Sequence, residues 1–267
     1  MLKTRILTAI VLVVLLLVVL FWLPKGAAIG FFAALVLAGA WEWTAFAGIE
    51  EQHWKLSYVT VIAALCAWGW DHTGRLDEIT LFMSVASLWW LVALGWLMFA
   101  PKRVNRVMAA LVGVVVLVPA YAGLSRMYDK LDRGAEQVLF LLILVWAADV
   151  GAFFAGRQWG RHKLAPQVSP GKTWEGVAGG MVFGLLAAAA GAWWFGRPMA
   201  AFLALGAAVV AISVVGDLTE SMFKRFAGLK DSGHVLPGHG GVLDRIDSIT
   251  AAVPVFVLGL TWLDLWR

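Results

Sequence analysis

Long apolar runs recur along almost the whole chain, and they constrain the fold more than any other feature of the sequence. A helix needs about 20 predominantly apolar residues to cross the hydrocarbon core of a bilayer. With soft edges, the runs near that length are 6–23, 27–47, 55–70, 79–99, 107–125, 136–155, 176–195, 199–216 and 249–266. The sequence therefore predicts an all-α, polytopic integral membrane protein with about nine transmembrane helices.

The composition agrees with this class. The chain is 61% hydrophobic, whereas a soluble domain has about 45–50% apolar residues. Its 16 tryptophans suit two aromatic belts at the membrane interfaces. The single cysteine, Cys66, excludes an internal disulfide and lies in an apolar run, which indicates a buried thiol. The net charge is +4. In a membrane protein, a surplus of basic residues usually sets the orientation in the bilayer or binds anionic lipid head groups, so it does not indicate a nucleic-acid partner.

The chain is predicted to form one membrane domain over residues 1–267, with N-terminal helices in 1–125 and catalytic helices and loops in 136–267. The first run is longer than the apolar core of a signal peptide and ends at Pro24-Lys25, so we interpret it as a retained helix rather than a cleaved signal. Runs 176–195 and 199–216 are separated only by Gly196-Arg197-Pro198, which predicts a tight helical hairpin. Dense Gly and Ala in 176–192 predict close helix packing.

The distribution of basic residues predicts the orientation. With the N-terminus in the cytoplasm and alternating loops, 14 of the 21 Lys and Arg residues fall on the inner side and seven on the outer side. The positive-inside rule favours this topology, although the inner loops are basic for functional reasons as well. Both polar loops, 156–175 and 217–248, then face the cytoplasm, where nucleotides are available.

The second of these loops concentrates ionisable groups that suit phosphate chemistry. Asp217 follows an apolar helix, and Asp244 and Asp247 share a face if the approach to the last helix is helical. Such carboxylates can hold one or two divalent cations such as Mg²⁺ between nucleotide phosphates. The alternative is a purely structural role, in which these carboxylates are solvated or form salt bridges with Arg225 and Arg245.

Basic residues and glycines in the same loop extend this hypothesis. Lys224, Arg225 and Lys230 can donate to phosphate oxygens, or they can form a patch for anionic lipid head groups. The run 237–241 predicts a turn in which glycines allow positive φ and close backbone approach. His239 within it is either a phosphate donor, a partner that orients a carboxylate, or a surface histidine.

The loop Ser169-Pro-Gly-Lys172-Thr173-Trp-Glu175-Gly ends like a Walker A motif, but the earlier glycine is replaced by Pro166. We expect no β-strand before it and reject the P-loop. What remains is a phosphate-binding turn that enters a helix, with Lys172 as the point charge and Ser169 or Thr173 as a cap or hydroxyl ligand.

Two further acids lie in apolar runs. Asp149 is either hydrogen-bonded to a neighbouring helix or part of the active-site wall, and we favour the wall. Glu42, between Trp41 and Trp43, lies near an inner helix end. Snorkelling to the interface accounts for it, and a functional role is the alternative.

The polar motifs together resemble the signature of the phosphatidate cytidylyltransferase family, also called CDP-diacylglycerol synthases. The matching segments are Ser221-Met-Phe-Lys224-Arg225, Lys230-Asp231-Ser-Gly233, Leu236-Pro-Gly-His239-Gly-Gly241 and Asp244-Arg245-Ile-Asp247. The loop 169–176 and the Asp149 helix also resemble the family, and Glu42-Trp43 does so weakly.

The resemblance implies transfer of CMP from CTP to phosphatidate, giving CDP-diacylglycerol and pyrophosphate in phospholipid biosynthesis. It implies Mg²⁺, with K⁺ as a second cation, a homodimer, and a multi-pass protein of the bacterial inner membrane. By the family's pattern, Asp217 and Asp244 would bind metal, with Asp247 close by. The other expected catalytic residues are Ser221, Lys224, Arg225, Lys230, Asp231, His239, Arg245 and Asp247, and the expected substrate-binding residues are Asp149, Ser169, Lys172, Thr173 and Glu175.

Two other functions remain open from the residues. Another CTP-using membrane enzyme, such as an isoprenoid-lipid cytidylyltransferase or a polyprenol kinase, would have similar site chemistry. A cation transporter would use Asp149, Asp217 and Asp247 along a pathway. Transport predicts acids spread through the midplane of several spans, whereas these acids are concentrated at one face.

Overall fold

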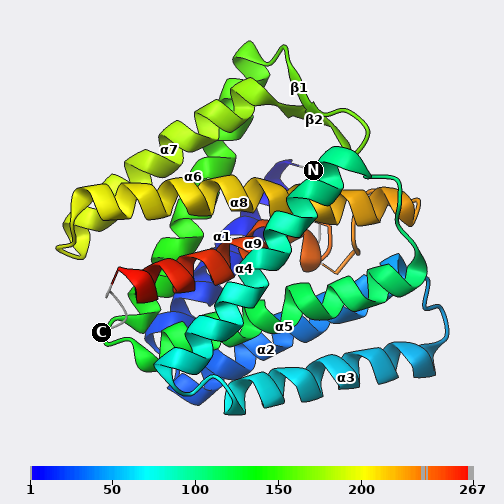
Figure 1. Cartoon of the computed structure of the whole chain (residues 1–267), viewed down its shortest axis with the longest axis horizontal. Coiled ribbons are helices and arrows are strands. Elements are labelled where there is room, and N and C mark those ends of the chain that lie inside the picture. The colour runs from blue at the N-terminus through cyan, green and yellow to red at the C-terminus, as the bar shows by residue number, and fades with distance from the viewer. Residues whose placement is uncertain (1, 236–237, 239, 264–267) are drawn as a thin grey trace.

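The structure is a computed structural model that describes residues 2–235, 238 and 240–263, and over these residues it is almost entirely helical (Figure 1). The elements are α1 (Leu2–Phe21), α2 (Lys25–Phe46), α3 (Gln52–Asp71), α4 (Leu76–Phe99), α5 (Arg106–Lys130), α6 (Gly134–Trp159), β1 (Lys163–Ala165), β2 (Ser169–Thr173), α7 (Trp174–Trp194), α8 (Met199–Phe226) and α9 (Leu243–Trp262). Each predicted apolar run coincides with one of these helices, except that the run 249–266 continues past the end of α9 and beyond the described residues. Within the described residues, six of them, α2 and α4 to α8, are long and apolar enough to cross a membrane.

Helix α8 is longer than predicted. The sequence analysis ended this helix near residue 216 and placed 217–248 in a loop, but the helix continues to Phe226. Leu218, Met222 and Phe223 are buried and continue its apolar face, so the polar residues between them do not interrupt the helix. Asp217 therefore lies within α8, and the connection to α9 is much shorter than expected. The helical approach to the last apolar run is confirmed, because α9 begins at Leu243.

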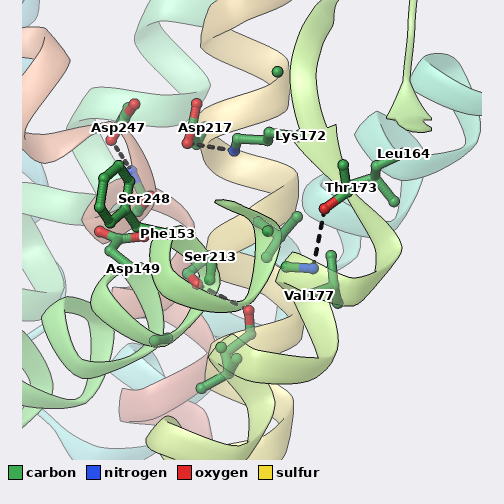
Figure 2. A pocket seen from close by; sticks show the side chains of 18 of the residues that line it. Asp149, Phe153, Leu164, Lys172, Thr173, Val177, Ser213, Asp217, Asp247 and Ser248 are labelled. Atoms are coloured by element: carbon green, nitrogen blue, oxygen red, sulfur yellow. Dashed lines mark hydrogen bonds and ion pairs between the residues drawn. The ribbon is translucent and has the colours of Figure 1, made fainter. Parts of the chain in front are cut away.

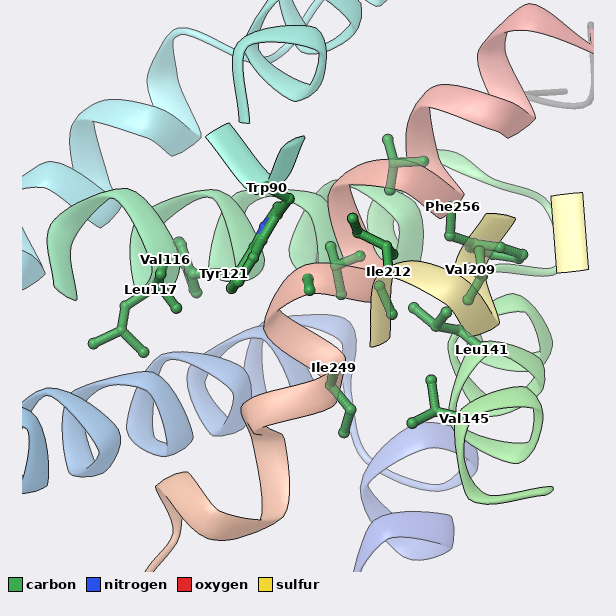
Figure 3. Packing of buried hydrophobic residues seen from close by; sticks show 14 of the residues in the cluster. Trp90, Val116, Leu117, Tyr121, Leu141, Val145, Val209, Ile212, Ile249 and Phe256 are labelled. Atoms are coloured by element: carbon green, nitrogen blue, oxygen red, sulfur yellow. The ribbon is translucent and has the colours of Figure 1, made fainter. Parts of the chain in front are cut away.

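The buried core joins helices that are distant in sequence. In Figure 1, α8 crosses the middle of the molecule, with α7 and the two strands above it and α2, α3 and α5 below it. Figure 3 shows buried side chains from α4, α5, α6, α8 and α9 gathered in one cluster, among them Trp90, Leu141, Ile212 and Phe256. Cys66 is also buried and free, as predicted.

Helices α6 and α7 approach each other through small residues. A Cβ atom added to Gly179 would lie 2.2 Å from Ala155 Cβ and 2.7 Å from the carbonyl oxygen of Gly151. Only glycine fits at this spacing, which confirms the predicted close packing. The turn after α7 is also confirmed, since Gly196 adopts a φ of +62° between α7 and α8.

A short antiparallel hairpin of β1 and β2 joins α6 to α7. The prediction that no strand precedes the Lys172 region was therefore wrong, because residues 169–173 are a strand rather than a turn. The hairpin is only partly buried and mostly polar, so it lacks the alternation of apolar residues that identifies a strand in sequence. It is not the parallel strand of a P-loop fold, and the rejection of a P-loop stands.

Hydrogen bonds at the two ends of α2 and α5 show that these helices run antiparallel, as expected if successive helices alternate in direction. At one end, Trp43 Nε1 of α2 donates to the carbonyl of Ala109 in α5 at 2.8 Å. At the other end, Lys25 Nζ of α2 donates to the carbonyl of Asp129 in α5 at 2.9 Å. The hairpin, the end of α8 and the start of α9 all lie at the Trp43 end of the bundle, which positions the polar groups together.

Candidate active site

A cavity of about 650 Å³ lies where α6, β2, α7, α8 and α9 meet. The residues that line it come from a stretch of about a hundred positions, from Ala148 to Ser248. Figure 2 shows Asp149, Lys172, Asp217 and Asp247 around it. The predicted site residues that line the cavity are Asp149, Lys172, Thr173, Asp217, Lys224, Asp231, Asp244, Arg245 and Asp247.

The cavity has a polar end and an apolar wall. The lysines and most of the acids come from the first turns of α9, the last turns of α8 and strand β2, while Asp149 comes from α6 and Asp231 from the connection between α8 and α9. The wall consists of small and apolar residues of α6, α7 and α8, including Ala152, Phe153, Val177 and Val214. Such a cavity can accommodate a polar group together with part of an apolar chain.

Each of two lysines in the cavity neutralises a predicted metal ligand. Lys172 Nζ of β2 donates to Asp217 Oδ2 of α8, and Ser221 Oγ, one turn later, lies 3.4 Å from Asp217 Oδ1. Lys224 Nζ donates to Asp244 Oδ1 at 2.7 Å and forms an ion pair with Glu220 Oε1 at 3.1 Å. The partners of these acids are therefore Lys172 and Lys224 rather than Arg225 and Arg245.

The donor set suits a hard cation, although no ready metal site is formed. In the described part of the chain, no three His, Cys, Asp or Glu side chains are grouped so that they could hold a metal ion. Asp149, Asp217, Asp244 and Asp247 nevertheless face one cavity, and carboxylate oxygens are the ligands that Mg²⁺ prefers. A cation at Asp217 or Asp244 would compete with a lysine ammonium group, so the metal assignment stays a prediction.

The start of α7 is held by two side chains of the Lys172 loop. Thr173 is the N-cap of α7, and its Oγ1 accepts a hydrogen bond from the Gly176 N–H at 3.1 Å. Its predicted capping role is confirmed. Glu175 does not line the cavity; its carboxylate accepts the His162 N–H at 3.2 Å and lies 2.7 Å from His162 Nδ1. It therefore closes the base of the hairpin.

Four other predicted residues lie at the margin of the site or outside the description. Arg225 is exposed and donates to the carbonyls of Val168 and Leu229. Ser169 and Lys230 do not line the cavity, and Lys230 is exposed. His239 lies outside the described residues. Gly238 and Gly240, on either side of position 239, adopt φ values of +76° and +81°. These positive values support the predicted glycine turn.

Two buried glutamates differ from the prediction, since the interpretation of Glu42 was wrong and a role for Glu220 was not predicted. Glu42 is only 6% exposed and accepts hydrogen bonds from Ser232, Val242 and Leu243, so the snorkelling interpretation was wrong. A glutamate inside an apolar run was the available signal, but its partners lie about 190 to 200 positions away and cannot be inferred from spacing. Glu220 is 3% exposed, and its signal was the i,i+4 spacing to Lys224.

The fold and the cavity together define a helical membrane protein in which acids and lysines meet at one end of the bundle. The sequence profile of the Cytidylyltransferase family matches residues 3–263. The chain is 43% identical to the phosphatidate cytidylyltransferase of Pseudomonas aeruginosa, over all of this chain and 99% of the relative. It is 42% identical to the Haemophilus influenzae protein of the same name, over 96% of this chain and 97% of that protein. This chain belongs to the cytidylyltransferase family.

Proposed function

We propose that this protein transfers CMP from CTP to phosphatidate and releases pyrophosphate, which makes it a phosphatidate cytidylyltransferase. The observation that carries the proposal is the meeting of Asp217, Asp244 and Asp247 with Lys172 and Lys224 in one cavity at one end of an apolar bundle. The names of its full-length relatives support the same activity.

The proposed reaction joins two polyanions. A phosphate oxygen of phosphatidate attacks the α-phosphorus of CTP, a new P–O–P linkage forms, and the bond to pyrophosphate breaks. The attacking oxygen is already anionic, so the step needs little help from a general base. The main barrier is electrostatic repulsion, which positioned cationic groups lower.

The two lysines have the geometry for this task. In the structure they neutralise Asp217 and Asp244, and these carboxylates hold the ammonium groups inside the cavity. An arriving phosphate can take up the same ammonium protons in hydrogen bonds. Bound Mg²⁺ would supply further charge neutralisation, and Asp217 and Asp244, with Asp247 nearby, are the residues that would hold it. K⁺ as a second cation stays part of the proposal.

The remaining roles follow from position. Asp149, Thr173, Asp231 and Arg245 line the cavity and would contact substrate. Ser221 would keep Asp217 in place. Arg225 in the last turn of α8, with Lys230 and His239 in the segment that follows in the chain, would attract anionic substrates, while Ser169 and Glu175 would shape the hairpin.

For the whole molecule, we propose that helices α1 to α9 of the described residues all cross the bacterial inner membrane and that the cavity faces the cytoplasm. The excess of basic residues at the cavity end supports this orientation. The phosphatidate acyl chains would lie along the apolar wall of the cavity. A homodimer is part of the proposal through the family resemblance.

The test is a direct assay on protein purified in detergent. Radiolabelled CTP, phosphatidate and Mg²⁺ should give a labelled lipid together with stoichiometric pyrophosphate. An isoprenoid phosphate and a free polyprenol, offered in place of phosphatidate, should give none. Labelled product from an isoprenoid lipid alone would replace phosphatidate as the substrate.

A further inference from the structure

Glu42 of α2 is buried at the point where the loop after α8 enters α9. Its Oε2 accepts hydrogen bonds from Ser232 Oγ at 2.8 Å and from the Leu243 N–H at 2.9 Å. Its Oε1 accepts the Val242 N–H at 2.9 Å. One carboxylate therefore binds both the loop and the first residues of the helix that carries Asp244.

The partners of Glu42 in turn hold Asp244. The Ser232 N–H and the Gly241 N–H each donate to Asp244 Oδ2 at 2.9 Å. Ser232 Oγ, which donates to Glu42, accepts the Asp244 N–H at 3.2 Å. Because Lys224 occupies Asp244 Oδ1, both oxygens of this carboxylate are fixed by named groups.

Two glycines let the loop close around the Glu42 carboxylate. A Cβ atom on Gly233 would lie 2.4 Å from Oε1, and one on Gly241 would lie 2.3 Å from Oε2. A side chain at either position would force the loop or the Glu42 carboxylate to move. Both glycines therefore lie directly against the carboxylate of Glu42, a residue on a helix that is distant in sequence.

We propose that Glu42 is a positioning residue for the reaction: through Ser232 and Gly241 it sets the orientation in which Asp244 meets the cation-bound nucleotide. The proposal rests on the function proposed above, in which Asp244 is a metal ligand. Glu42 itself does not line the cavity, so it would act on the reaction through Asp244.

The contacts require a hydrogen-bond acceptor at both side-chain oxygens of residue 42. The three groups that face Glu42 are all donors, and two of them are N–H groups at the positive end of the α9 dipole. A glutamine has nearly the same shape but would direct its NH₂ group at one of these N–H groups. Groups that orient a metal ligand typically change metal affinity by about 10- to 100-fold when they are lost.

The experiment measures metal affinity apart from turnover. Mn²⁺ binding is followed by electron paramagnetic resonance on the full-length protein in detergent, without substrate, and the Mg²⁺ dependence of CMP transfer is measured separately. Glu42→Gln is expected to raise the Mn²⁺ dissociation constant about 10- to 100-fold and the half-saturating Mg²⁺ concentration by a similar factor. Excess Mg²⁺ should restore most of the turnover.

Two companion variants support the interpretation. Thr44→Val is the matched control, because Thr44 is buried on the same helix but its hydroxyl donates only to the nearby Trp41 carbonyl. It should leave both metal measurements unchanged. Ser232→Ala removes the middle of the network, should shift both in the same direction as Glu42→Gln, and carries the test if Glu42→Gln does not fold.

The possible failures can be told apart with Asp244→Asn. If Asp244→Asn abolishes Mn²⁺ binding while Glu42→Gln and Ser232→Ala lower only the active fraction, Glu42 is a structural anchor and the inference is overturned. If Asp244→Asn leaves Mn²⁺ binding unchanged, the metal role of Asp244 falls, and the inference falls with it. CMP transfer to phosphatidate can survive either result.

Discussion

Lys224 lies between two carboxylates and is held by both. Its ammonium nitrogen is 2.7 Å from Asp244 Oδ1 and 3.1 Å from Glu220 Oε1, and its side chain is only 11% exposed. Neither oxygen of Glu220 has a hydrogen-bond partner in the described part of the protein, so the ion pair is its compensation. The local structure therefore depends on this lysine, and in the proposed reaction catalysis depends on it as well.

A pair of variants should separate these two dependences. Lys224→Met leaves buried negative charge without a counter-ion, so we expect a loss of about 3–5 kcal/mol in the free energy of unfolding. Adding Glu220→Gln should recover part of that stability, while CMP transfer stays reduced by at least about 100-fold. Denaturation in detergent and the radiolabel assay measure the two effects. Recovery of turnover in the double variant would leave Lys224 with a structural role only.

Asp217 offers a simpler case. Its side chain and that of Lys172 are each 27% exposed, so their ion pair contributes about 1 kcal/mol or less to stability. We expect Asp217→Asn to stay folded, with a melting temperature close to that of the parent protein. If Asp217 binds the cation, CMP transfer should fall at least about 100-fold. Near-normal turnover of the purified variant would remove it from the metal role.

At the scale of elements, the apolar runs were sufficient to predict the helices, because bilayer thickness sets their length. They were not sufficient to end α8 at Phe226, since Leu218 and Met222 continue its buried face beneath polar neighbours. The β1–β2 hairpin had no apolar alternation to reveal it. In the site, local motifs predicted most of the charged residues that line the cavity, but they also included Ser169, Glu175 and Lys230, which do not line it. The role of Glu42 depends on contacts between distant helices.

The contact between α6 and α7 leads to a prediction about packing. Gly179→Ala would force a Cβ atom to 2.2 Å from Ala155 Cβ, so we expect a loss of about 1–3 kcal/mol in stability. Gly95→Ala on α4 is the matched control, because its Cβ would meet nothing within 4 Å. Alanine there should be neutral or stabilise the helix by about 0.5–1 kcal/mol. Equal melting temperatures for both variants would contradict the close approach of the two helices.

For the whole molecule, the proposed orientation can be read by labelling. In a Cys66→Ala background, Arg161→Cys places a thiol at an exposed position beside the hairpin, and Asp132→Cys places one at an exposed position between α5 and α6. A membrane-impermeant maleimide should label Asp132→Cys in intact cells and Arg161→Cys only after permeabilisation. The reverse labelling pattern would show that the protein has the opposite orientation in the membrane.

In the proposed membrane arrangement, the length of α8 would determine the depth of the site in the bilayer. Its 28 residues span about 42 Å, whereas the hydrocarbon layer is only about 30 Å thick. A rod of that size protrudes by roughly two turns, and Asp217 lies at about the level where the protrusion begins. One continuous helix would thus both span the bilayer and place the site at the level of the lipid head groups. A lipid phosphate could then reach the site while its acyl chains stay in the hydrocarbon layer.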